Sequence, residues 1–113
     1  MRKHRQNRDE DKKRLQELLL FLESPSLATR IATVKDIGSL GSVAIPAAKQ
    51  LVPLVSDIED DLRNAAILAL VSIGHGSKRV AKAVRSLLDD ETEGQDPYTK
   101  TRAYWILERI ESA

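Results

Sequence analysis

The sequence predicts an all-α protein in which about six helices pair as antiparallel hairpins and stack into a solenoid. Three observations support this fold class. A shift of 33 residues brings the apolar pattern of the chain onto itself, apolar residues recur at three- and four-residue spacing, and most links between the expected helices are short. Such spacing is typical of one face of a helix. A fixed repeat of this length indicates stacked units, and short links make neighbouring helices antiparallel.

Two sets of helices repeat along the chain, each in its own register. In the odd-numbered helices the shift aligns apolar positions such as Leu18, Leu51 and Val84. In the even-numbered helices the same shift aligns Ile37 with Leu70. The last link is four residues longer, and once these are allowed for, Leu70 aligns with Leu107. Because a single hairpin cannot bury its apolar face alone, the hairpins are expected to stack on one another.

The helices are expected, in order, near residues 10–23, 26–40, 43–56, 60–73, 77–89 and 97–111. In the third helix Pro46 fits a first turn, whereas Pro53 should bend or fray the last turn. In the fourth helix the acids Asp60 and Asp61 favour the helix start, and Gly74 supplies its end. Most of the chain is therefore assigned to helices.

Length and composition fit one domain with a modest core. The chain has 113 residues, of which 42% are hydrophobic, 31% charged and only 4% aromatic. This balance is typical of globular domains, and it leaves Leu, Val, Ile and Ala to fill the core. The absence of cysteine excludes disulfides and thiolate chemistry and suits a reducing compartment. No signal peptide or membrane-length apolar run is apparent, so we expect a cytoplasmic protein.

Charge is unevenly distributed along the chain, although the net charge is only +1. The first fourteen residues carry seven Lys or Arg against three acids, and the rest carry eleven against fourteen. We therefore expect a flexible basic arm at residues 1–9, followed by a single helical domain at residues 10–113. Cations favour binding to phosphates, so the arm could bind nucleic acid or an acidic surface. A solvated tail is the simpler interpretation, because no aromatic residue is present to stack on bases.

The unit of the chain that matches most closely resembles a HEAT repeat. It is LVPLVSDIEDDLRNAAILALVSIG, residues 51–74, and the likeness extends over most of residues 15–110. The chain is most similar to the short HEAT-like form of bacterial and archaeal proteins, including phycobilisome lyases. This resemblance implies a right-handed α-solenoid that serves as a scaffold for a protein partner. It also implies a structural ladder between units, and the matching positions are Asp57, Arg63, Asp90 and Lys100.

The resemblance also implies a concave face lined by the second helix of each hairpin. Five basic residues are expected on part of this face: Lys49, Lys78, Arg79, Lys82 and Arg85. This patch could receive an acidic protein segment or a DNA backbone. It could equally be an ordinary charged helix face.

The last helix holds three of the four aromatic residues, Tyr98, Tyr104 and Trp105. Aromatic side chains are enriched at interfaces, so this end of the solenoid could contact a second copy of the chain or another partner. Alternatively, Trp105 caps the end by packing under the long link. Both interpretations fit the sequence.

No motif for catalysis or metal binding is apparent. The two histidines, His4 and His75, lie far apart and lack the spacing of metal ligands. The segment GHGSK at residues 74–78 has neither the remaining residues of a phosphate loop nor a preceding strand. We therefore expect no enzyme, no metal and no cofactor. A protein-interaction module is favoured, with nucleic-acid binding as the alternative, and a role in bilin attachment is suggested by the family likeness alone.

Overall fold

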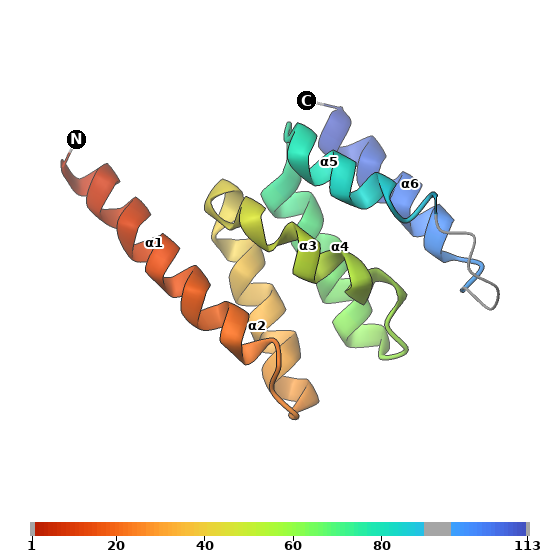
Figure 1. Ribbon diagram of the computed structural model, residues 1–113, viewed down its shortest axis with the longest axis horizontal. Coiled ribbons are helices and arrows are strands. Elements are labelled where there is room, and N and C mark those ends of the chain that lie inside the picture. The colour runs from red at the N-terminus through yellow and green to blue at the C-terminus, as the bar shows by residue number, and fades with distance from the viewer. Residues whose placement is uncertain (1, 90–95, 113) are drawn as a thin grey trace.

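The computed structural model describes residues 2–89 and 96–112, and this part of the chain is helical (Figure 1). Its elements, in order, are α1 Arg2–Phe21, α2 Leu27–Ser39, the 3-10 helix η1 Gly41–Ala47, α3 Ala48–Leu51, the 3-10 helix η2 Val52–Ser56, α4 Asp60–Gly74, α5 Lys78–Arg85 and α6 Thr99–Glu111. The predicted all-α class is confirmed. The third predicted helix corresponds to η1, α3 and η2 together, termed the middle segment below.

The helices form a flat stack of two layers. One layer contains α1, the middle segment and α5, and the other contains α2, α4 and α6 (Figure 1). The molecule measures 50 × 35 × 17 Å. Its shortest dimension is near the depth of two helices, since a helix with its side chains is about 10 Å across. This arrangement of stacked hairpins is the predicted α-solenoid.

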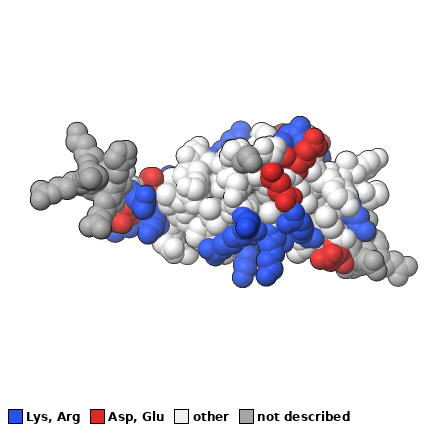
Figure 2. Space-filling view, turned by 90° about the horizontal axis from the view of Figure 1, so that it is seen from above, with Lys and Arg blue, Asp and Glu red and all other residues white. Residues whose placement is uncertain are grey.

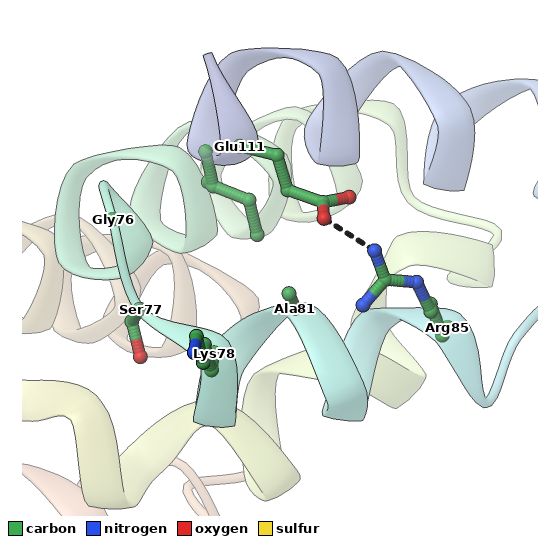
Figure 3. A pocket seen from close by; sticks show the side chains of 7 residues that line it. Gly76, Ser77, Lys78, Ala81, Arg85 and Glu111 are labelled. Atoms are coloured by element: carbon green, nitrogen blue, oxygen red, sulfur yellow. Dashed lines mark hydrogen bonds and ion pairs between the residues drawn. The ribbon is translucent and has the colours of Figure 1, made fainter. Parts of the chain in front are cut away.

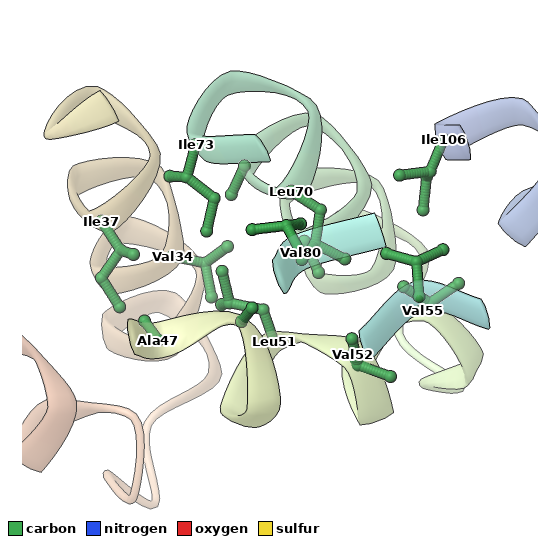
Figure 4. Packing of buried hydrophobic residues seen from close by; sticks show 14 of the residues in the cluster. Val34, Ile37, Ala47, Leu51, Val52, Val55, Leu70, Ile73, Val80 and Ile106 are labelled. Atoms are coloured by element: carbon green, nitrogen blue, oxygen red, sulfur yellow. The ribbon is translucent and has the colours of Figure 1, made fainter. Parts of the chain in front are cut away.

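The core is centred on α4, which packs against α2, the middle segment, α5 and α6. Its buried residues follow one face at helical spacing: Leu62, Ala65, Ala66, Ala69, Leu70, Ile73 and Gly74. Figure 4 shows side chains of the neighbouring elements converging on this face, among them the buried Leu51, Val80 and Ile106. Burying a side chain of this size contributes roughly 1.5–3 kcal/mol, so these contacts hold the hairpins together.

Small residues let α4 approach its neighbours closely. A Cβ added to Gly38 of α2 would lie 3.1 Å from the Cα atom of Ala69. At the other end of α4, a Cβ on Gly74 would lie 2.6 Å from Cγ1 of Val80. Both distances are shorter than ordinary van der Waals contact. The row of alanines in α4 is therefore explained by the close approach of the helices around it.

The middle segment owes its irregular winding to two prolines. Pro46 lies in η1 and Pro53 in η2, and only Ala48–Leu51 is α-helical. Because proline has no N–H, the α-helical bond from residue 53 to the carbonyl of Lys49 cannot form. The sequence predicted a disturbance only in the last turn, whereas the structure has 3-10 geometry on both sides of α3.

The predicted start of the first helix is wrong. α1 begins at Arg2 rather than near residue 10, so residues 2–9 continue the helix instead of preceding it. No glycine or proline interrupts this run, and acids stand four residues before bases in the pairs Asp9–Lys13 and Glu10–Arg14. Pairs in this order stabilise a helix. The flexibility expected of residues 1–9 stays a prediction.

Candidate partner-binding groove

Three of the five predicted basic residues line one groove, between the middle segment and α5. The groove has a volume of about 570 Å³. Its lining residues are Lys49, Val52, Pro53, Arg79, Lys82, Ala83 and Ser86, and it is termed the basic groove. The three cations are exposed, whereas Val52 is only 7% exposed and lies deeper. The groove thus combines a basic rim with an apolar floor.

The local sequence of α5 places one wall of the basic groove. Ser77 caps the helix, and its Oγ accepts the backbone N–H of Val80 at 3.1 Å. Burial of Val80, Ala81 and Val84 fixes the side of α5 that faces the core. The groove-lining Arg79, Lys82 and Ser86 stand three and four residues apart, so they share another face. The opposite wall carries Lys49, one turn before Pro53.

The basic groove is positively charged. None of its lining residues is Asp or Glu, and Figure 2 shows Lys and Arg side chains gathered on the side of the α3 and α5 layer. None of the three cations pairs with an acid of the part of the chain that the structure describes. An anionic ligand would therefore meet charges that no described carboxylate already neutralises.

The remaining two residues of the predicted patch face another side of α5. Lys78 and Arg85 line a smaller pocket of about 240 Å³ next to α6, and Arg85 forms an ion pair with Glu111 (Figure 3). The structure therefore divides the predicted five-residue patch. Register along the chain showed that these residues are exposed, but it did not show which side of α5 lies against α6.

The predicted ladder residue Arg63 closes the turn before α4. Its Nη1 donates to the backbone carbonyl of Asp57 at 3.0 Å, and its Nη2 lies 2.5 Å from a carboxylate oxygen of Asp60. The carboxylate of Asp57 accepts the backbone N–H of Glu59 at 2.9 Å instead. Arg63 thus stabilises the turn before α4 through the carbonyl of Asp57 and the carboxylate of Asp60.

Arg102, rather than Lys100, makes the matching contacts before α6. Its Nη1 lies 2.7 Å from a carboxylate oxygen of Asp96 and 3.5 Å from the carbonyl oxygen of Val55. The other oxygen of Asp96 accepts the backbone N–H of Tyr98 at 2.8 Å. The bond to Arg102 and then the bond to Tyr98 lower the pKa of Asp96.

The ladder predicted for the last unit, between Asp90 and Lys100, stays a prediction. Lys100 is exposed, and Asp90 lies outside the described residues. The buried residues of α6 keep the predicted register, with Leu107 and Ile110 in the core, so both Asp96 and Arg102 are shifted relative to the buried positions. The six-residue spacing of Asp57–Arg63 recurs in Asp96–Arg102, and this signal could have found the pair.

Of the three aromatic residues predicted as an interface, only Trp105 is among the lining residues of a groove. Trp105 lines a second groove, between α4 and α6, of about 440 Å³; its lining residues are Asn64, Ile67, Leu68, Thr101, Arg102 and Trp105. This is termed the Trp105 groove. Trp105 is 38% exposed and Leu68 59%, and the guanidinium of Arg109 lies 3.4 Å from the centre of the indole ring. Leu68 was not predicted as a surface residue of interest.

The two tyrosines lie outside the Trp105 groove. Both are more exposed than Trp105, at 64% for Tyr98 and 61% for Tyr104, and the ring of Tyr98 lies 5.8 Å from the guanidinium of Arg102. An interface at these three aromatic residues stays a prediction. The alternative cap under the long link depends on residues 90–95, which lie outside the described part.

These stacked hairpins define an α-solenoid, a class in which each unit packs on its neighbours. The family model of HEAT repeats matches residues 15–108, so the chain belongs to the HEAT repeat family. A search of curated proteins and a search of solved structures found no match. HEAT repeats generally mediate protein interaction and scaffolding.

No group of three or more His, Asp or Glu side chains in the part of the chain that the structure describes could hold a metal ion. Nor does any described helix combine the length and apolar character needed to cross a membrane.

Proposed function

We propose that the protein is a non-enzymatic interaction module in the cytoplasm whose basic groove docks a protein partner. The observation that carries this proposal is the composition of the groove. Lys49, Arg79 and Lys82 surround an apolar floor that includes Val52, with no acid among the lining residues. An apolar centre within a polar rim is the usual anatomy of a protein interface.

The mechanism is recognition by a surface that is formed before the partner arrives. Leu51 and Val55 anchor one wall of the groove in the core, and Val80 and Val84 anchor the other. Because both walls are already ordered, little backbone entropy is lost in them on binding. The partner then supplies most of the adjustment.

Site-specific photo-crosslinking tests where a partner docks. A photoreactive residue replaces Ser86 in the basic groove or, as a matched control, the exposed Ser72 of α4 in the other layer. In extract of the cells that make the protein, we expect a discrete crosslinked product from position 86 and not from position 72. A Lys82→Glu change should abolish that product. Equal products from both positions, or a product indifferent to Lys82→Glu, would contradict docking in the groove.

The structure gives DNA binding less support than protein docking. Only three of the five predicted cations share the basic groove, and Arg85 is engaged by Glu111. No aromatic side chain lines the groove to stack on a base. DNA binding through three phosphate contacts would show a slope of about −2.7 in log affinity against log salt, which allows the two functions to be distinguished.

A further inference from the structure

We infer that the basic groove binds a protein segment in which acidic side chains flank an aliphatic one. This inference rests on the proposed function and names the chemistry of the docked segment. It is carried by one juxtaposition: three exposed cations stand around an apolar floor in a single groove.

The cations of the groove differ in their contacts from three arginines elsewhere in the described residues. Arg63, Arg85 and Arg102 each pair with a carboxylate of this chain, whereas Arg79 and Lys82 pair with none of the described acids. Within the described residues, acids of the chain thus satisfy the structural cations, whereas no described acid pairs with the groove cations. Carboxylates of a partner would supply the missing charge, with the strongest geometry at the fork of Arg79.

The apolar floor of the groove favours an acidic segment that includes an aliphatic side chain over a purely anionic ligand. Val52, Pro53 and Ala83 present apolar atoms between the two basic walls. A phosphate backbone or a purely acidic run has nothing to bury there, whereas an aliphatic side chain gains by leaving water. The favoured ligand therefore combines the two features, with the aliphatic side chain on the floor and acids on both sides toward Lys49 and Lys82.

Fluorescence anisotropy with three labelled model peptides of equal length tests this inference. The first places one leucine between two pairs of glutamates, the second replaces the leucine with serine, and the third replaces all glutamates with glutamines. We expect the first peptide to bind about tenfold more tightly than either of the others. Near-equal affinity of the leucine and serine peptides, or no binding of the first peptide, would overturn the inference.

The chain offers a matched control for position. Lys82→Glu inside the groove and Lys78→Glu outside it change the same helix and the same net charge. We expect Lys82→Glu to weaken binding of the leucine peptide about tenfold and Lys78→Glu to leave it within about twofold. Circular dichroism melting of both variants checks that each is folded. Equal losses would show a general charge effect and would overturn assignment to the groove.

Two further outcomes keep this inference separate from the proposed function. A short DNA duplex that binds more tightly than the leucine peptide, with a salt slope near about −2.7, would assign the groove to phosphates. The crosslink at position 86 could still depend on Lys82 while none of the peptides bound. That result would support protein docking in the groove and would contradict an acidic and aliphatic ligand. Mass spectrometry of the crosslinked segment gives its composition directly.

Discussion

Gly38 of α2 lies close against α4, and any larger side chain there would press on Ala69 of that helix. An added Cβ would lie 3.1 Å from the Cα atom of Ala69, which is backbone and cannot rotate away. We expect Gly38→Val to lower the free energy of unfolding by about 2 kcal/mol, because the two helices must separate. Urea denaturation measures the loss. Ser39→Val, at the exposed neighbouring position, should stay within about 0.5 kcal/mol.

The turn before α6 predicts a specific dependence on pH. Hydrogen bonds from Arg102 and then from Tyr98 hold the pKa of Asp96 below its ordinary value of 3.8. Since the folded-state pKa is lowered, the stability contributed by Asp96 is present above that value and is lost as pH falls through the folded-state pKa. We expect Asp96→Asn to flatten the acid side of the plot of urea midpoint against pH.

The matched control for this pH dependence is Asp61→Asn, which removes an exposed acid at the start of α4. This change should leave the acid side of the plot as steep as in the native chain. An Asp96→Asn variant as acid-sensitive as the native chain would show that the bond to Arg102 does not contribute to stability.

Residue roles were only partly predictable from the sequence. The place of Arg63 followed from the repeat, because the Asp-to-Arg spacing is intact in the best-kept unit. The role of Arg102 did not follow, since the extra residues of the last link move the acid and the arginine relative to the buried positions. The ion pair between Arg85 and Glu111 joins two helices, and no pattern within one helix shows such a partner.

At the scale of elements, two of the three leucines of α4 have opposite roles. Leu70 is fully buried, whereas Leu68 is 59% exposed beside the Trp105 groove. We expect Leu70→Ala to cost about 2–5 kcal/mol of unfolding free energy, through lost burial and the cavity left behind. Leu68→Ala should cost less than about 1 kcal/mol. Urea denaturation of both variants makes the comparison, and similar losses would contradict the position of α4 in the core.

The positions of the helices followed from the sequence better than their winding did. Apolar periodicity and short links placed α2, α4 and α6 within a few residues of their observed bounds, because burial on one face requires that pattern. The 3-10 geometry of the middle segment was missed because it arises from two prolines acting on the same helix. The early start of α1 was missed because charged residues were taken to indicate an arm.

For the whole molecule, the sequence leaves open whether the aromatic end contacts a second copy, contacts another partner or is capped by Trp105. The Trp105 groove is the surface at which contact between copies can be tested. If two copies associate there, Trp105→Ala should convert a dimer to a monomer, because aromatic anchors dominate interfaces. Light scattering over a range of concentrations measures the mass. Tyr98→Ala, which alters an aromatic residue outside the groove, should leave the dimer intact. A native chain that is monomeric throughout would contradict the contact.

The solenoid as a whole was predictable because the apolar pattern of the sequence repeats. A shift of 33 residues specifies which faces are buried, and stacking is the only way to bury them all. The grooves were not predictable to the same extent. Each is formed by residues from two elements, such as Lys49 and Lys82, and its shape depends on how far apart those elements lie.

The prolines of the middle segment give the two walls of the basic groove different helical geometry. A 3-10 helix rises about 2.0 Å per residue and an α-helix about 1.5 Å. One wall continues into the five residues of η2, while the other is the α-helix α5. The side chains of the two walls therefore follow one another at different spacings along the groove. We expect a regularly spaced segment to contact both walls in only a few positions, so that the helical geometry of the walls as well as their charge limits where it binds.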